Sequence, residues 1–147
     1  MKTDHFWDER GQGTAELLFV LLVLVLLLFG MVEIARGVSI RHALDVSTEK
    51  AARVLSINPA DYDYATSLIR TEVNGSILGG GYGDRVVIQL RDAVSGAEIS
   101  PADLATLGFG YRFVVEATVP WQPNIPFLSN PARTLSAMHF GIVESFP

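Results

Sequence analysis

An uncharged run of apolar residues, Leu17–Val32, constrains this chain more than any other feature. The hydrocarbon core of a bilayer is about 30 Å thick, and about 20 mostly apolar helical residues are needed to cross it. The run reaches that length when a few flanking residues are included, with Glu16 and Glu33 near its two ends. Its many leucines also favour a helix. We therefore predict a membrane-spanning helix over residues of about 15–35.

A cleaved secretory signal peptide is the main alternative interpretation of the apolar run. Such signals have a shorter apolar core and a small-residue cleavage site directly after it. The residues that follow the run here, 33–39, offer no convincing site of that kind. We therefore expect the helix to be retained. Its orientation stays open, because Lys and Arg are nearly balanced on its two sides and the positive-inside rule does not decide.

The composition limits the classes of function that the rest of the chain can have. Outside the apolar run and the residues before it, roughly 110 of the 147 residues remain, enough for one modest core. The net charge is −5 without any basic cluster, which argues against nucleic acid as a partner. The chain has no cysteine, so disulfides, thiol catalysis and thiolate metal sites are excluded, whereas the compartment is not identified.

The helical pattern continues beyond the apolar run with no breaker before Ile57, apart from a weak point at Gly37. Small and apolar residues at helical spacing predict one narrow buried face, made of Leu44, Thr48, Ala51, Ala52 and Leu55. Two pairs of opposite charges stand four residues apart, Arg41 with Asp45 and Glu49 with Arg53. We predict one helix from about Gly13 to Ile57, roughly 65 Å long, that ends at Asn58-Pro59.

The remaining residues predict a small head of helices and strands. A second helix is expected over Pro59–Asn74 and a helical turn over Pro101–Leu107. The glycine-rich segment 79–83 lacks lysine and is expected to be a flexible connector rather than a phosphate-binding loop. Plausible buried positions in the second helix are Tyr64, Leu68, Ile69 and Val73.

Alternating apolar and polar residues predict three strands, Arg85–Arg91, Tyr111–Trp121 and Thr134–Phe146. The second strand has the clearest buried face, formed by Phe113, Val115, Ala117 and Val119. Packing of these antiparallel strands on the outer half of the long helix gives an α+β fold. The expected division of the chain is a leader over 1–11, the long helix over 12–57 and the head over 58–147.

The residues around the start of the apolar run resemble a type IV prepilin signal. A short polar leader ends in Gly11, and Glu16 is the fifth residue of a chain that would begin at Gln12. The motif Gly11–Glu16, with Phe29–Arg36 later in the helix, is similar to the TadE-like family of pseudopilins and minor pilins of the tight-adherence (Flp) pilus system. Further similarity lies in His42–Leu44, Ala51–Arg53 and, more loosely, Arg133–Met138, so the resemblance is strongest over Gly11–Arg53.

The resemblance implies a pilin-like fold and a topology. The leader would stay in the cytoplasm, the helix would cross the bacterial inner membrane once, and the head would lie outside the cytoplasm. A prepilin peptidase would cut between Gly11 and Gln12, because a cut after Gly13 would make Glu16 the third residue rather than the fifth. The implied partners are this peptidase, membrane lipid, and the other pilin subunits and assembly platform of a homo- or hetero-oligomeric filament.

Glu16 has a chemical reason to stand one helical turn after a new N-terminus. Cleavage would create an α-amine on Gln12 that is largely protonated at neutral pH. A carboxylate at the edge of the hydrocarbon is costly unless it is paired or reaches the interface. We expect Glu16 to pair with its own or a neighbouring subunit's amine and to set axial register, as a single polar group does in a coiled coil. The simpler alternative is that Glu16 only reaches water.

Two further places are candidate contact sites. Glu33 and Arg36 stand three residues apart at the expected outer interface, so they can form an ordinary i,i+3 ion pair. The segment 120–131 contains four prolines and is expected to be an exposed irregular loop. Its large apolar side chains, Trp121, Phe127 and Leu128, either tuck under the sheet or form a contact surface, and both interpretations stay open.

The sequence carries no recognisable catalytic, cofactor-binding or metal-binding motif. We therefore expect a non-enzymatic minor pilin or pseudopilin that takes part in assembly of an Flp-type pilus, without a cofactor. The sizeable head favours a minor, tip or priming role over that of a major subunit. The alternatives are a membrane-anchored periplasmic binding or sensor domain and a pseudopilin of a type II secretion machine, with a tethered enzyme last.

Overall fold

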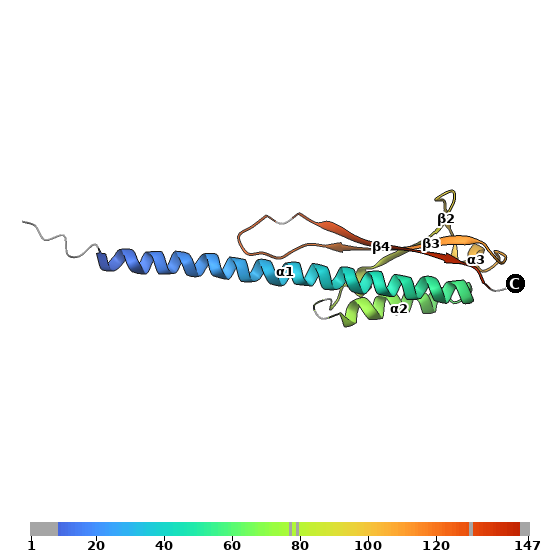
Figure 1. Cartoon of the computed structure of the whole chain (residues 1–147), viewed down its shortest axis with the longest axis horizontal. Coiled ribbons are helices and arrows are strands. Elements are labelled where there is room, and N and C mark those ends of the chain that lie inside the picture. Colours follow the sequence, from blue (N-terminus) through green and yellow to red (C-terminus); the bar gives the residue numbers. More distant parts are fainter. Residues whose placement is uncertain (1–8, 77, 79, 130, 145–147) are drawn as a thin grey trace, which may run out of the picture.

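The computed structural model describes residues 9–76, 78, 80–129 and 131–144, and side chains from Gly13 onward. Predictions that concern residues 1–8 of the leader, Gly79 and Phe146 lie outside the described residues. The described chain forms a long rod with a head built along one half of it (Figure 1).

The rod is a single helix, α1 (Glu9–Ile57), of 49 residues, or about 74 Å at 1.5 Å per residue. The expected unbroken helix is therefore present, and it begins four residues before Gly13. Its C-terminus lies at Ile57, where Asn58 donates its backbone N–H to the carbonyl of Val54 at 2.9 Å. Pro59 disfavours the helical conformation for the residue before it, so the chain turns away at this point.

The head contains one antiparallel sheet with the strand order β2-β1-β3-β4. Its long strands are β1 (Val87–Asp92), β3 (Arg112–Trp121) and β4 (Arg133–Ile142), as the alternating pattern predicts. The two-residue strand β2 (Glu98–Ile99) is an addition to the three predicted strands, and it pairs with β1 through Leu90 and Arg91. It was missed because two residues are too few to show an alternation.

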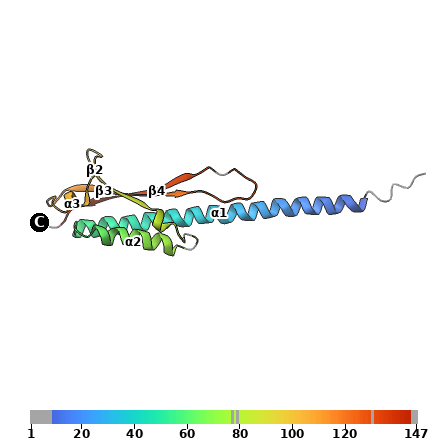
Figure 2. The same ribbon diagram turned by 180° about the vertical axis from the view of Figure 1, so that it is seen from behind.

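The outer half of α1 lies between two layers, the sheet on one side and α2 (Tyr62–Gly75) on the other (Figures 1 and 2). The expected face of β3 is buried, and so is the expected face of α1. The core is formed by Ile40, Leu44, Ala51, Leu55, Ile69, Val73, Phe113, Val115, Ala117 and Val119, with others. The predicted α+β fold, a long helix packed on a small antiparallel sheet, is confirmed.

The buried face of α2 differs from the prediction at two positions, since Leu68 is only partly buried and Tyr64 is exposed. Ile69 and Val73 are buried as expected, but Tyr64 is 60% exposed and Ala65 is buried in its place. Residues four apart share a helix face, which places Ala65 in line with Ile69 and Val73. The small side chain of Ala65 allows α2 to approach α1 closely, whereas the bulk of Tyr64 points to solvent.

The glycine-rich connector is tied to the end of α2 by one side chain. The amide oxygen of Asn74 accepts the backbone N–H of Gly81 at 3.1 Å and that of Gly83 at 2.8 Å. Gly83 opens the 3-10 turn η1 (Gly83–Arg85), and a Cβ there would lie 2.2 Å from the carbonyl oxygen of Arg70. The described part of this segment is thus anchored rather than free, and it needs glycine for close approach.

The charge pairs on the outer half of α1 follow the prediction only in part. Glu49 and Arg53 lie 3.8 Å apart as an i,i+4 pair. Asp45 instead lies 3.0 Å from Nε2 of His139 on β4. The tertiary partner replaces the expected Arg41 because β4 runs directly alongside this face of α1.

The turn between β1 and β2 is organised by Asp92. Its carboxylate accepts the backbone N–H of Val94 at 2.9 Å and of Ser95 at 2.5 Å, and it also accepts the hydroxyl of Tyr111. These hydrogen bonds, led by that from the Ser95 backbone, hold the pKa of Asp92 well below its usual range. The hydrogen bond that the Tyr111 hydroxyl donates to Asp92 raises the pKa of Tyr111. Beyond the turn, Ser100 caps the short helix α3 (Pro101–Leu104).

Candidate membrane and subunit interface

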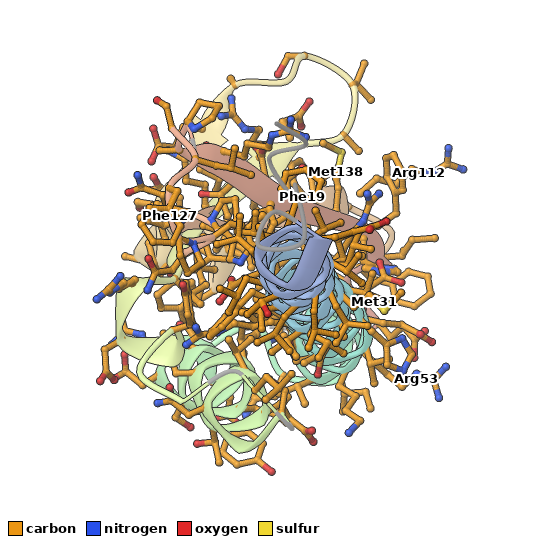
Figure 3. The ribbon with its side chains drawn as sticks, turned by 90° about the vertical axis from the view of Figure 1, so that its left-hand side faces the viewer. Phe19, Met31, Arg53, Arg112, Phe127 and Met138 are labelled. Carbon is orange, nitrogen blue, oxygen red and sulfur yellow. The ribbon has the colours of Figure 1, made fainter. Side chains whose placement is uncertain are left out.

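The N-terminal half of α1 is apolar on all sides and carries almost no protein cover. The large side chains of the run Leu17–Val32, apart from the partly covered Leu26, are between 39% and 69% exposed. Figure 3 looks along the helix and shows Phe19 and Met31 on different sides of it. Among the described residues this is one helix long and apolar enough to cross a membrane. Such a surface requires an apolar surrounding, whether lipid or other helices.

The predicted processing and assembly residues lie at the start of this helix. The backbone of Gly11 and Gln12 is already helical, within the first turn of α1. Glu16 follows Gln12 by about one turn, and its side chain is exposed. The structure therefore leaves the Glu16 carboxylate accessible to a partner from outside this chain.

At the other end of the apolar run, Glu33 and Arg36 form an ion pair. Nη1 of Arg36 lies 3.7 Å from Oε1 of Glu33, and the Glu33 side chain is largely buried. Nε of Arg36 donates to the carbonyl oxygen of Leu78 at 2.9 Å. Arg36 thus ties the end of the apolar half of α1 to the segment that follows α2.

Two guanidinium groups lie over the ring of Tyr82. The Cζ atom of Arg36 is 5.2 Å from the ring centre, and that of Arg85 is 5.4 Å away. Both distances allow cation–π attraction. Arg36 comes from α1 and Arg85 from η1, so this cluster joins elements far apart in the sequence just beyond the end of the apolar run.

The contact loop, residues 120–131, uses its apolar side chains in two ways. Trp121, at the end of β3, packs on α1, where a Cβ on Gly37 would lie 3.0 Å from the indole ring. Phe127 and Leu128 remain 91% and 58% exposed. The two open interpretations therefore apply to different residues. Trp121 is covered, although by α1 and not by the sheet, whereas Phe127 and Leu128 form an exposed apolar surface at the tip of the loop.

The tip of the loop is a tight turn with an unusual residue in it. The backbone N–H of Leu128 donates to the carbonyl of Ile125 at 3.3 Å, across Pro126 and Phe127. Phe127 has φ +62, and proline followed by a residue of positive φ is the pattern of a type II turn. That position favours glycine, and a bulky side chain there stores strain of about 1–3 kcal/mol.

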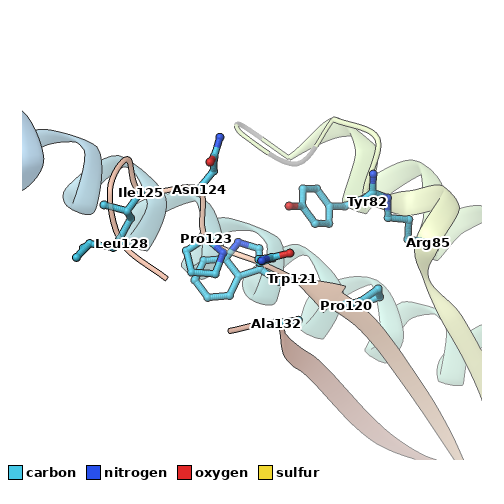
Figure 4. A pocket seen from close by; sticks show the side chains of 10 residues that line it. Tyr82, Arg85, Pro120, Trp121, Pro123, Asn124, Ile125, Leu128 and Ala132 are labelled. Carbon is cyan, nitrogen blue, oxygen red and sulfur yellow. The ribbon is translucent and has the colours of Figure 1, made fainter. Parts of the chain in front are cut away.

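Between the loop and η1 lies a pocket of about 490 Å³ (Figure 4). Its lining includes the rings of Tyr82 and Trp121, the Arg85 side chain, and Asn124, Ile125 and Leu128 of the loop. Sequence reasoning singled out Trp121 and Leu128 but missed Tyr82 and Arg85. Their only signal was a tyrosine within a glycine-rich segment, which does not say what it faces.

Two buried polar atoms near the root of the loop have no hydrogen-bond partner among the described atoms, Oε2 of Glu33 and Nε1 of Trp121. Glu33 precedes Gly37 by one helical turn, so it lies on the helix face that Trp121 covers. Oε2 of Glu33 is an acceptor and Nε1 of Trp121 is a donor. The contact between the root of the contact loop and α1 therefore contains two polar atoms among apolar neighbours.

Comparison with known proteins identifies one family. A family model described as TadE-like protein matches residues 11–53, which confirms the resemblance over this part of the chain. The matched segment covers nearly the whole of α1, from the predicted cleavage glycine to four residues before the end of the helix. Neither a curated protein nor a solved structure matches the chain.

Proposed function

We propose that this protein is a minor pilin or pseudopilin of a tight-adherence (Flp, type IVc-like) pilus system, cleaved by a prepilin peptidase. The TadE-like match over residues 11–53 suggests involvement in a Tad pilus system. The observation that carries the finer proposal is one helix with two environments. Its inner half is exposed and apolar, and its outer half is the spine of a folded head.

In this proposal α1 holds the precursor in the bacterial inner membrane, with the head outside the cytoplasm. The exposed inner half is then available to lipid before assembly and to the helices of other subunits during it. Glu16 pairs with the α-amine created on Gln12, its own or a neighbour's, which sets the axial register. The head has a scaffolding role rather than an enzymatic one, and the chain uses no cofactor.

The N-terminus of the mature protein tests this function. Intact mass and N-terminal peptide sequencing from native membranes are expected to show a start at Gln12. Replacement of Gly11 by Leu should abolish processing, because a small residue fits the peptidase subsite and a bulky one does not. The matched control, Gly13→Leu, should still be cut after Gly11.

Other outcomes would redirect the proposal. A start at Met1 in the presence of the peptidase would indicate an ordinary membrane-anchored domain with a binding or sensing role. A start at Thr14 would place Glu16 third and contradict the pairing scheme. Normal processing with normal piliation in a Gly11→Leu variant would contradict the whole proposal. Loss of Flp pili on deletion of the chain would distinguish this system from type II secretion.

A further inference from the structure

The contact loop begins in the head and its tip reaches back beside the apolar half of α1. Figures 1 and 2 both show the connection between β3 and β4 reaching back along α1 toward its N-terminus, past the end of α2. Trp121 fixes the level of the loop's root, because its ring packs at Gly37, one turn beyond Glu33. The tip therefore lies on the membrane side of Gly37.

Burial along α1 supports the same placement. Within the run Leu17–Val32 most side chains are exposed, but Leu26 is partly covered. Leu26 shares a helix face with Glu33 and Gly37, because residues seven and eleven apart are separated by nearly two and three full turns. Leu26 is seven residues, about 10 Å, on the membrane side of Glu33. The loop is the described segment that lies along this part of α1 in both views.

Whatever surrounds the apolar run must therefore also surround the tip of the contact loop. If α1 spans a bilayer, Phe127 and Leu128 lie at the level of acyl chains, and their exposed side chains meet hydrocarbon instead of water. Burial of a Phe side chain in this way is worth about 1.5–3 kcal/mol. That gain is comparable to the strain of a positive φ at Phe127, which is not offset if the side chain lies in water.

Two features of the loop lower the cost of placing its backbone near hydrocarbon. A loop in hydrocarbon is costly because each unsatisfied N–H costs several kcal/mol. Four of the twelve residues in 120–131 are prolines, which have no N–H. The turn at the tip also closes its own hydrogen bond, from Leu128 to Ile125.

The root of the loop has the composition of a membrane–water interface. Trp121 lies beyond the end of the apolar run, at the level where aromatic residues meet headgroups, and the buried ring of Tyr82 lies beside it. Arg85 lines the pocket beside them, where a guanidinium can meet a lipid phosphate. From the tip of the loop toward the head, apolar side chains are followed by aromatic and then by cationic ones. This is the order of hydrocarbon, interface and phosphate in one leaflet of a bilayer.

We propose that the contact loop is a second membrane element, whose tip, Phe127 and Leu128, inserts into the leaflet on the head side. Its root would lie at the headgroups, with Arg85 facing lipid phosphate. The occupant of this surface is a phospholipid bilayer. The proposal rests on the membrane-spanning role of α1, and it adds a fixed tilt and rotation of the head relative to the membrane.

The test uses the absence of cysteine from the chain, because any introduced thiol is then the only one. Full-length Phe127→Cys carries a nitroxide in vesicles of phosphatidylethanolamine and phosphatidylglycerol. Accessibility to oxygen and to a polar nickel chelate reports depth. Leu24→Cys in the apolar run is the lipid reference, and Val94→Cys, on the exposed turn between β1 and β2, is the aqueous reference.

We expect the label at 127 to resemble the one at 24, with oxygen access several-fold above chelate access, and the label at 94 to show the reverse. A label at 127 that reads as aqueous while 24 reads as lipid would overturn the loop proposal alone. Aqueous readings at both 127 and 24 would instead contradict the membrane-spanning helix. Shielding of 127 from both reagents would mean protein cover, and would also overturn the proposal.

A second variant tests whether the apolar tip causes the insertion. With the nitroxide moved to Leu128→Cys, the change Phe127→Asp should raise chelate access at 128 several-fold, and Phe127→Leu should restore the original reading. Val94→Asp is the matched control and should leave the label at 128 unchanged. An unchanged reading in Phe127→Asp would show that the side chain at 127 does not hold the loop in lipid.

Discussion

The two halves of α1 belong to one continuous helix yet have opposite surroundings. In the inner half, the large side chains of Leu17–Val32 other than Leu26 are at least 39% exposed. In the outer half, Ile40, Leu44 and Leu55 are almost completely buried between the sheet and α2. Backbone geometry is the same in both, so the difference lies in the side chains and in what can pack against them.

The outer half is buried because its small and hydroxyl-bearing residues permit close packing. Ala51 and Ala52 let the neighbouring layers approach the helix. The buried hydroxyls of Thr48 and Ser56 donate to helix carbonyls four residues earlier, at 2.6 and 2.9 Å. Because these hydroxyls find acceptors within the helix, they can be buried there. The hydroxyl oxygen of Ser56 also accepts the backbone N–H of Ile142 on β4, at 3.2 Å. The inner half has bulky leucines all round and leaves no such narrow face.

Truncation of one leucine in each half should have very different effects on the stability of the head. Leu44→Ala should lower the free energy of unfolding of the head by about 2–5 kcal/mol, because it leaves a cavity in the core. Leu24→Ala should change the same quantity by less than about 0.5 kcal/mol. Urea unfolding of the full chain in nanodiscs, monitored through hydrogen exchange of β3 amides, measures the free energy of unfolding of both variants. Equal losses would mean that the halves are not separate environments.

A charge in the inner half should act on insertion and not on the head. Leu24→Lys should make membrane insertion less favourable by about 2.5–3.5 kcal/mol, since the residue is near the middle of the run. Leu17→Lys, at the end of the run, should cost less because the side chain can reach the interface. Partition between membrane and soluble fractions after translation measures the effect. Unchanged partition for Leu24→Lys would contradict a membrane span.

Gly37 marks the junction between the halves, where the indole of Trp121 leaves little room for a side chain. Gly37→Val should destabilise the packing of the contact loop by about 1–3 kcal/mol through overpacking. Gly30→Val is the matched control, because a Cβ at Gly30 meets nothing within 4 Å. Fluorescence of Trp121, in a Trp7→Phe background, reports the change. Identical spectra for the two variants would place Trp121 away from α1.

The smallest expected effect is on the pH dependence of the stability of the head, to which the run Leu17–Val32 adds nothing because it carries no titratable group. The native pKa of Asp92 is lowered from its usual 3.8, so its ionised form adds stability at higher pH. That contribution is complete well above 3.8 and is lost as pH falls below it toward the native pKa. Asp92→Asn should reduce the loss of unfolding free energy at acidic pH, measured by urea unfolding at a series of pH values. An unchanged loss would mean that other carboxylates cause it.

Sequence alone was sufficient for features whose signals are local. The span and continuity of α1 follow from uninterrupted helical residues, and the buried face of β3 follows from alternation, although Val114 on its other face is also buried. The TadE-like resemblance was also readable, because its residues are contiguous within 11–53. The predicted roles of Gly11, Gln12 and Glu16 remain predictions that the N-terminal experiment addresses.

Only the tertiary structure decided which distant residues meet. His139 pairs with Asp45 across 94 positions of sequence, and Trp121 packs at Gly37. Arg36, Tyr82 and Arg85 gather at one level of α1. None of these contacts has a periodic signature, because each depends on how the sheet and α2 dock on the helix. Hydrophobic periodicity states which face is buried, whereas the docking of layers determines what that face touches.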